Sequence, residues 1–418
     1  MLLSHCQEQA DKLLETGRDN IFLTGHAGSG KSFLTRHFLR HRDRKSFPVV
    51  ASTGAAAVLV GGRTFHSFFG LGILEGGPIP TIAKAMADRR LIKRLRTMEG
   101  FVLDEVSMIS GPTLNVAETI CRQARDDPRP WGGARVIAVG DFAQLPPVNP
   151  HSRKKEWAFL DPAWERSQFS PVMLKSIQRS EDEAYLRVLN WIREGQVNDE
   201  VRNYLDRRVD EDIDESKSTH LFPHRSRADQ LNFQRLSEIE SPMREFQTEY
   251  WGSLHGIASL KKQAPIPELL QLKKSALVMI RVNDPGLRYV NGSTGIIQSI
   301  EEECLVIELK NKTVVEIRPS AFSLLNAEGE ITASATNFPV MLAYATTIHK
   351  AQGATLDRMV CDLRHLWEPG QAYVALSRLR SGDGLTLVGW EESSIRVDPQ
   401  VTEFYRSIAR QNEVQSPT

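Results

Sequence analysis

The sequence is poor in cysteine and has no long apolar run. Among its 418 residues are four cysteines, Cys6, Cys121, Cys304 and Cys361. They lie far apart and form no Cys-x-x-Cys pair, which favours scattered reduced thiols over a zinc site or a disulfide framework. No stretch approaches the ~20 apolar residues that a membrane span requires. We therefore expect a soluble protein of the cytoplasm with no membrane partner.

The sequence also has no net charge, since 52 Lys and Arg residues balance 52 Asp and Glu residues. A nucleic-acid partner would therefore have to bind in a local basic channel rather than on a generally basic surface. The hydrophobic share of 41% is enough for buried cores. A chain of this length predicts about two to four domains.

One glycine-rich motif stands out near the amino terminus. Residues 21–32 have the pattern of an apolar strand, a glycine-rich loop and a helix start. The spacing Gly25-x-x-x-x-Gly30-Lys31-Ser32 is that of a P-loop, whose backbone N–H groups bind phosphate oxygens. Lys31 can reach the β- and γ-phosphates, and the Ser32 hydroxyl can bind Mg²⁺. The predicted nucleotide loop comprises Gly25, His26, Ala27, Gly28, Ser29, Gly30, Lys31 and Ser32.

Polar side chains follow two further apolar strands. The strand that contains residues 101–103 leads into Asp104 and Glu105, and the strand 135–139 leads towards Gln144. Asp104 is predicted to hold Mg²⁺ through its water shell, and Glu105 to polarise the water that attacks ATP. The Gln144 amide is a candidate sensor of the γ-phosphate.

Two glutamines lie at the start of the first expected helix, residues 7–17. Gln7 precedes the apolar positions of this helix, and in several ATPases such a glutamine recognises the adenine edge. Gln9 is a close competitor for this role, and a solvated side chain is an equally good interpretation of Gln7.

Hydroxyl, imidazole and aromatic side chains crowd together in residues 61–70. This mixture suits a surface that holds phosphates and stacks bases. For Phe68 and Phe69, a place in the hydrophobic core is an equally good interpretation. Residues 71–80 are rich in Gly and Pro and predict an inserted loop or a small hairpin.

Strands that alternate with helices up to about residue 170 predict a parallel sheet with crossover connections. Residues 241–332 contain short apolar runs and turn residues that are typical of a small antiparallel barrel. An α/β pattern then resumes, so the chain contains two α/β units, of which only the first has a P-loop. The second unit can supply a guanidinium to the γ-phosphate, and Arg179 and Arg378 are the candidates.

Eight motifs in order carry a family resemblance: GHAGSGKS, ASTGAAA, RTFHSFFG, VLDEVSM, VGDFAQLPPV, IQR, TIHKAQGATLD and YVALSR. Together they resemble the superfamily 1 DNA helicases of the 5′→3′ branch, the Pif and RecD relatives, and most of all the Pif-like group. The resemblance implies an α/β fold with two RecA-like domains, residues 1–170 and residues 171–240 with 333–418. It also implies a wedge at about 71–80 and an SH3-like barrel at 241–332.

The resemblance also implies roles for individual residues. Gln7 matches an adenine-reading glutamine, and Lys31, Ser32, Asp104 and Glu105 match ATP and Mg²⁺ residues. The remaining matches are the γ-phosphate sensor Gln144, the arginine fingers Arg179 and Arg378, the nucleotide contact Gly353, and the single-stranded DNA residues Thr53, Thr64, His66, Asn291, His349 and Lys350.

The implied function is ATP-dependent 5′→3′ unwinding of DNA with ATP and Mg²⁺ as cofactors. The implied partners are single-stranded DNA and 5′-tailed duplex or G-quadruplex DNA, bound by a monomeric motor core. The chain departs from the family pattern at Ser180 and at Pro223-His224, where the family has Gln and Thr-Asn. Two other classes remain open, an ATPase subunit of a nuclease complex and a P-loop kinase.

Overall fold

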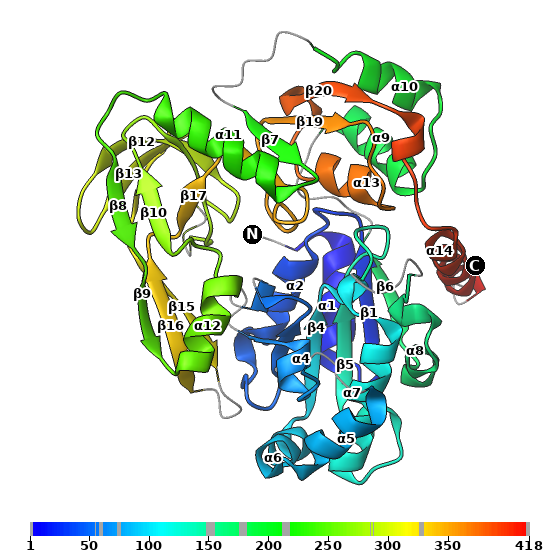
Figure 1. Cartoon of the computed structure of the whole chain (residues 1–418). Helices are drawn as coiled ribbons and strands as arrows, with labels where there is room; N and C mark the ends of the chain where they lie inside the picture. Colours follow the sequence, from blue (N-terminus) through cyan, green and yellow to red (C-terminus); the bar gives the residue numbers. More distant parts are fainter. Residues whose placement is uncertain are drawn as a thin grey trace. The chain divides into compact units, whose positions relative to one another are not determined.

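The structure is a computed structural model, shown in Figure 1. It describes residues 3–54, 56–57, 62–72, 77–147, 155–174, 182–210, 218–284, 286, 288–325 and 330–414. The contacts divide the chain into two compact units. The first comprises residues 1–179, 323–332 and 399–418, and the second comprises residues 180–322 and 333–398.

A six-stranded parallel sheet forms the centre of the first unit. Its strand order is β3-β2-β4-β5-β1-β6. The carboxyl ends of β4, β5 and β1 therefore lie next to one another. The strands are β1 (Ile21–Gly25), β2 (Val49–Ala51), β3 (Arg63–Thr64), β4 (Gly100–Asp104), β5 (Arg135–Val139) and β6 (Ser170–Leu174).

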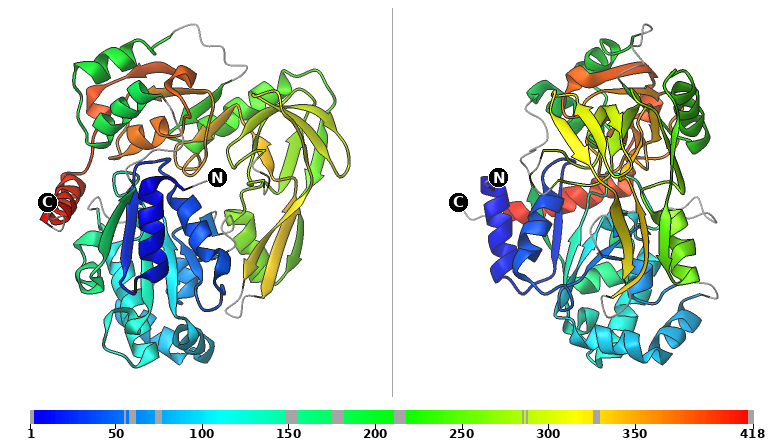
Figure 2. Two further views of the ribbon diagram at one scale, coloured as in Figure 1. Left: turned by 180° about the vertical axis from the view of Figure 1, so that it is seen from behind. Right: turned by 90° about the vertical axis from the view of Figure 1, so that its left-hand side faces the viewer.

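Successive side chains of each strand point to opposite faces of the sheet, and in β1, β2, β4 and β5 both sets are mostly apolar and buried. Helices therefore cover both faces. On one face, Leu23 and Ile137 pack with Leu14 of α1 and Phe38 of α2. Figure 2, left, shows α1 on the near face of the sheet. The helices of this unit are α1 (His5–Thr16), α2 (Lys31–Phe38), α4 (Phe65–Phe68), α5 (Pro78–Ala87), α6 (Arg89–Thr97), α7 (Gly111–Arg125), α8 (Pro162–Ser167) and α14 (Pro399–Val414).

The aromatic residues of the segment 61–70 lie in the core on the opposite face. Phe65, Phe68 and Phe69 are all at most 2% exposed. The Phe69 ring lies 5.4 Å from the Phe101 ring and 5.9 Å from the Trp131 ring, centroid to centroid. Of the two interpretations of Phe68 and Phe69, the core placement is confirmed, so these rings are not available to stack on bases.

A four-stranded parallel sheet in the order β18-β7-β19-β20 forms the centre of the second unit (Figure 1). Its strands are β7 (Thr219–Phe222), β18 (Ala345–Thr347), β19 (Met359–Leu363) and β20 (Leu385–Trp390). Its helices are α9 (Glu183–Arg193), α10 (Asp199–Asp206), α11 (Arg225–Ser237) and α13 (Gln371–Leu376). The expected return to an α/β pattern after the barrel is thus present.

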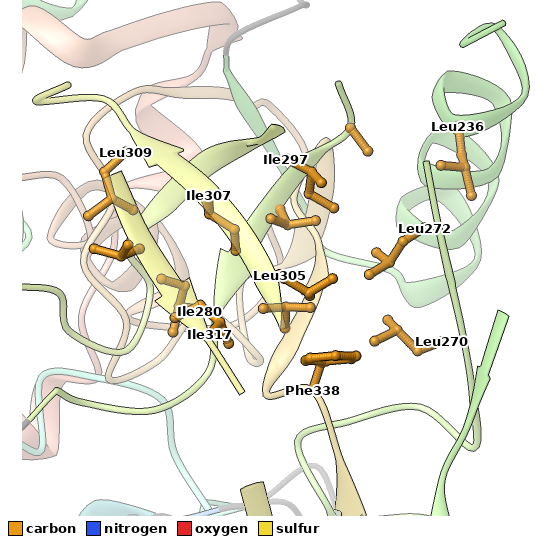
Figure 3. Close-up of a cluster of buried hydrophobic side chains, with 14 residues drawn as sticks. Leu236, Leu270, Leu272, Ile280, Ile297, Leu305, Ile307, Leu309, Ile317 and Phe338 are labelled. Atoms are coloured by element: carbon orange, nitrogen blue, oxygen red, sulfur yellow. The ribbon is translucent and has the colours of Figure 1, made fainter. Parts of the chain in front are cut away.

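The expected barrel is an antiparallel sheet in the order β14-β13-β12-β11-β17. Its core holds Ile280, Ile307 and Phe338 together with Leu270 (Figure 3). The strands are β11 (Leu277–Ile280), β12 (Thr294–Ile300), β13 (Leu305–Leu309), β14 (Val314–Ile317) and β17 (Val340–Leu342).

Smaller elements complete the second unit and the connections. The strand β8 pairs with β10, and β15, β16 and β9 form a three-stranded sheet. These are β8 (Arg244–Gln247), β9 (Glu249–Gly252), β10 (Leu269–Leu272), β15 (Ser320–Leu325), β16 (Ile331–Asn337) and the helix α12 (Leu254–Gln263). Short 3₁₀ turns are η1 (Leu39–His41), η2 (Val106–Met108), η3 (Pro130–Gly133), η4 (Ala158–Leu160), η5 (Gly382–Gly384) and η6 (Glu392–Ser394).

Two local expectations differ from the structure. Residues 73–76 of the segment 71–80 lie outside the described residues, and Pro78 begins the helix α5 instead of continuing a loop. A proline fits the first turn of a helix because its missing N–H is not needed there. The interpretation of this segment as a wedge, and the domain boundaries near 170, 240 and 332, stay predictions.

The last helix, α14, also differs, since we expected all of residues 333–418 in the second domain. The structure groups it with the first unit. The Tyr405 hydroxyl lies 3.0 Å from the Thr24 Oγ1 and 2.9 Å from the Asp141 Oδ1, and it accepts from the Phe142 N–H at 3.0 Å. The adjacent Phe404 ring packs against several aromatic rings of the first unit, namely Phe22, Phe142, Phe159 and Trp164.

No helix in the described part of the chain combines the length and apolar composition needed to cross a bilayer.

The Tyr405 hydroxyl predicts a stability effect. Tyr405→Phe removes the partner of Thr24, Asp141 and the Phe142 N–H while keeping the ring, so it should lower the free energy of unfolding by roughly 1–3 kcal/mol. Urea denaturation measures this change. Arg406→Ala, on the same helix and 64% exposed, is the control and should change stability by at most about 0.5 kcal/mol. Equal stabilities of wild type and Tyr405→Phe would contradict a structural role for these bonds.

Candidate functional site

The P-loop connects β1 to α2 and has the backbone geometry that the motif requires. Gly30, the residue before α2, has φ of 86°, in the left-handed region that favours glycine. The helix therefore starts abruptly at Lys31, and its N-terminus favours anions. The Lys31 Nζ donates to the Gly25 carbonyl at 2.8 Å and to the His26 carbonyl at 3.1 Å. The ammonium group is thus held at the loop.

The structure distinguishes the two glutamines of the first helix. Gln7 is 2% exposed, and its Nε2 donates to the Ser29 carbonyl of the P-loop at 3.1 Å. Its Oε1 accepts from the Ser4 N–H at 3.0 Å. Gln9 is exposed and pairs with His5. Gln7 is therefore the glutamine at the P-loop, and its adenine-reading role stays a prediction.

The paired carboxylates lie at the end of β4, two strands from the P-loop strand. Burial, followed by the negative charge of Glu105, raises the pKa of Asp104 to about 7. The positive charges of Lys31 and Arg36 oppose this shift, so the P-loop lysine acts on the Asp104 carboxyl. Glu105 has φ of 54°, a conformation that is strained for a residue with a side chain and recurs at functional sites.

Gln144 lies in the loop that follows β5, the strand between β4 and β1. It is 5% exposed, and its N–H donates to the Asp141 carbonyl at 3.0 Å. The Asp141 Oδ1 accepts from the Ala143 N–H at 3.1 Å as well as contacting Tyr405. A Cβ added to Gly140 would lie 3.0 Å from Val106 Cγ1, so the loops after β4 and β5 pack together. The fold therefore brings the three predicted ATP motifs to one sheet edge.

The donor chemistry at this edge fits Mg²⁺. Ser32 is exposed in the first turn of α2, and Asp104 lies at the end of β4. Both offer oxygen atoms, which are the ligands that Mg²⁺ prefers, usually alongside phosphate oxygens and water.

The DNA residues predicted in the first unit lie after β2 and at the end of β3. The Thr53 Oγ1 accepts from the Ala56 N–H, and the Thr64 Oγ1 accepts from the Ser67 N–H, both at 3.2 Å. Each hydroxyl therefore caps a helical turn. His66 is partly buried, and burial lowers its pKa. A DNA contact by these residues stays a prediction.

The predicted residues of the second unit gather after β18. His349 and Lys350 are exposed. Partial burial of the ammonium group, and then the charges of Arg225 and Arg281, lower the pKa of Lys350, so these cations lie near one another. A Cβ on Gly292 would lie 2.5 Å from the Thr355 nitrogen, so the barrel turn that contains Asn291 packs beside the segment 349–355. Gly353 of that segment faces open space.

Arg281 is a residue that the sequence analysis missed. It is 7% exposed, and burial lowers its pKa to about 10. Within the described part of the chain, its Nε has no hydrogen-bond partner and its Nη1 faces the Met279 Sδ at 3.5 Å. The position of Arg281 directly after the apolar strand β11 is the one feature of the sequence that could have indicated a buried arginine. Among the residues that the structure describes, no carboxylate is bonded to this buried guanidinium.

One of the two arginine-finger candidates, Arg378, lies buried in the second unit and is bonded within its own segment of the chain. Arg378 is 2% exposed, its Nε donates to the Val374 carbonyl at 2.8 Å, and its Nη2 donates to the Ser377 Oγ at 2.8 Å. Arg179 lies outside the described residues. Both roles stay predictions.

Comparison with known proteins gives consistent results. The family model of the PIF1-like helicases matches residues 5–203. The ATP-dependent DNA helicase Pif1 of Bdellovibrio bacteriovorus is 50% identical over 97% of this chain and 92% of its own length. The human ATP-dependent DNA helicase PIF1 is 33% identical over 94% of this chain, which spans 62% of the human protein. A crystal structure of Bacteroides Pif1 with ADP-AlF3 and single-stranded DNA matches with a TM-score of 0.66 and 28% identity, over 98% of each chain.

The buried guanidinium of Arg281 predicts an unusual mutational effect. Arg281→Met keeps much of the length of the side chain and removes a buried charge whose Nε has no hydrogen-bond partner among the described residues, so it should raise the free energy of unfolding by roughly 1–3 kcal/mol. Thermal and urea denaturation measure the change. A loss of stability in Arg281→Met would show that the guanidinium supports the fold instead.

Proposed function

The chain belongs to the PIF1-like helicase family, and we propose that it is an ATP-dependent DNA helicase that moves along single-stranded DNA. The observation that carries the proposal is the sheet edge of the first unit. There the loop with Lys31, the Asp104–Glu105 pair and the loop with Gln144 follow three adjacent parallel strands. In parallel α/β sheets, ligands bind outside the carboxyl ends of the strands.

We propose that this edge binds and hydrolyses ATP. The N–H groups of the P-loop and the Lys31 ammonium bind the β- and γ-phosphates, while Gln7 lies beside the loop for the adenine. The Glu105 carboxylate accepts a proton from the attacking water. The Gln144 amide bonds the γ-phosphate and loses this bond after hydrolysis.

We propose that Ser32 and Asp104 hold Mg²⁺, which neutralises charge on the phosphate oxygens. A bound cation and the Lys31 ammonium favour the ionised form of Asp104, against the burial that raises its pKa. Ser32 has a small side chain and is exposed at the start of α2, so its hydroxyl is accessible to a cation.

We propose Arg179 and Arg378 as groups that stabilise charge on the γ-phosphate, with Gly353 near the nucleotide. For Arg378, this role requires that the guanidinium exchange its bonds to the Val374 carbonyl and the Ser377 Oγ for bonds to phosphate.

We propose that the cations of the second unit bind the phosphates of the DNA strand. Lys350 and Arg225 are exposed, although Arg225 pairs with Asp229 at 3.1 Å, and Arg281 lies near them with no carboxylate of the described residues bonded to it. Lysine and arginine supply most of the sequence-independent affinity for nucleic acids. The remaining proposed contacts are Thr53, Thr64, His66, Asn291 and His349. The 5′→3′ direction, the preference for 5′-tailed duplex or G-quadruplex DNA, and the monomeric state rest on the family pattern.

ATP turnover with and without single-stranded DNA tests the proposal. We expect oligodeoxythymidylate to stimulate turnover many-fold. Lys31→Ala should abolish turnover and unwinding while DNA binding stays measurable, because Lys31 lies at the P-loop. If DNA does not change the rate of ATP turnover, the proposed translocation along DNA is wrong. If Lys31→Ala hydrolyses ATP at the wild-type rate, the proposed ATP site is wrong.

Glu105→Gln tests the proton acceptor. The amide keeps the shape of the side chain but not its charge, so turnover should fall about 10²- to 10⁴-fold while ATP and DNA still bind. Stopped-flow phosphate release measures the rate, and filter binding measures the two affinities. If turnover stays near the wild-type value, another group activates the water.

Lys350→Ala tests the DNA face. The loss of one phosphate contact should raise the DNA concentration for half-maximal ATPase, with a much smaller change in maximal turnover. The slope of log K against log salt should fall by about 0.7. Lys312→Ala, an exposed lysine paired with Glu308, is the matched control and should leave both unchanged. A large fall in DNA-free ATPase with an unchanged DNA requirement would place Lys350 at the nucleotide.

A further inference from the structure

An exposed tryptophan and a histidine stack on each other in the second unit. The Trp367 and His224 rings have a centroid distance of 4.9 Å and an interplanar angle of 17°. His224 lies between β7 and α11, and Trp367 lies between β19 and α13. Trp367 is 47% exposed, so much of its indole surface remains open to solvent. A ligand can therefore contact Trp367 and His224 without any rearrangement of the core.

The loop that carries Trp367 is held in place by hydrogen bonds. The N–H groups of Trp367 and Glu368 both donate to the Oε1 of Gln371, a fully buried side chain, at 3.2 and 3.1 Å. The preceding Leu366 is buried, and its carbonyl accepts from Arg396 Nη2 at 2.8 Å. Because its backbone is fixed, the indole loses little conformational freedom when a second ring stacks on it.

The stacked pair lies at the same sheet edge as the proposed DNA cations. The strands β18, β7 and β19 are adjacent and parallel, so Lys350, His224 and Trp367 all follow their carboxyl ends. The Glu368 carboxylate, next to Trp367, raises the pKa of His349 against the larger effect of burial, which lowers it. The positive charge of Arg225, next to His224, lowers the pKa of Lys350, so these two cations also lie near each other.

We propose that Trp367, backed by His224, is a stacking site for one base of the single strand whose phosphates are bound at Lys350 and Arg225. The inference rests on the proposed function and names a base contact where the chain has Pro223-His224 in place of the family's Thr-Asn. Stacking on an aromatic side chain tolerates any base because every base has a π-face. In a duplex, neighbouring base pairs cover these faces, so the site selects single-stranded DNA.

Two oligonucleotides separate base stacking from phosphate binding. One is oligodeoxythymidylate, and the other has the same length and backbone with abasic positions throughout. Fluorescence polarisation at fixed low salt gives the affinity of each for wild type, Trp367→Ala and Trp251→Ala. Trp251 in β9 is the matched control, since it is 63% exposed and has no stacking partner among the described residues.

Trp367→Ala should weaken binding of oligodeoxythymidylate about 5- to 100-fold and leave binding of the abasic strand unchanged. Trp251→Ala should change neither. An equal loss on both strands, or no loss on either, would overturn the stacking site. If wild type binds neither strand, the proposed function fails and this inference falls with it.

Phenylalanine variants guard against a folding defect in Trp367→Ala. Trp367→Phe keeps an aromatic face and should bind oligodeoxythymidylate within a few-fold of wild type. We also expect DNA to quench the tryptophan fluorescence of wild type and of Trp251→Phe, and this quenching should be lost in Trp367→Phe. Full quenching in Trp367→Phe would show that no base lies against this indole.

Discussion

The register of three parallel strands is the constraint on which the proposed ATP site depends. Because β4, β5 and β1 are neighbours and run in the same direction, the residues that follow them reach one edge of the sheet. The bonds of Lys31 to the Gly25 and His26 carbonyls fix the ammonium at that edge, where it acts on the Asp104 carboxyl. A shift of one strand would separate groups that are more than 70 residues apart in the sequence.

The second unit offers another electrostatic feature, a group of three cations, Lys350, Arg225 and Arg281, of which Arg225 is paired with Asp229 at 3.1 Å. Burying a charge without a partner costs free energy that the fold itself does not recover. In the described part of the chain, Arg281 is a buried charge with no carboxylate bonded to it, and the exposed Lys350 and Arg225 lie near it. We propose that DNA phosphates offset this cost, whereas the groups proposed to act on ATP lie in the first unit. One chain thus carries a proposed nucleotide site and a proposed surface for binding the DNA strand.

Much of this arrangement could be predicted from the sequence, because local patterns encode it. Strand-loop-helix spacing predicts the P-loop, and carboxylates after an apolar strand predict Asp104 and Glu105. The sequence left Gln7 and Gln9 as competitors, and only the fold distinguishes them, since Gln7, Ala10 and Leu14 are the buried residues of α1. Contacts between distant segments have no such local signal. The bonds of Tyr405 to Thr24 and Asp141 and the stack of Trp367 on His224 exist only once the chain is folded.

We propose that ATP hydrolysis drives this chain along one DNA strand in the 5′→3′ direction. Strand displacement on matched duplexes with a 5′ tail, a 3′ tail or a 5′-tailed G-quadruplex, each with and without ATP, tests it most directly. We expect ATP-dependent displacement of the 5′-tailed duplex and none of the 3′-tailed duplex. Displacement from the 3′-tailed duplex alone, or displacement that does not require ATP, would contradict it.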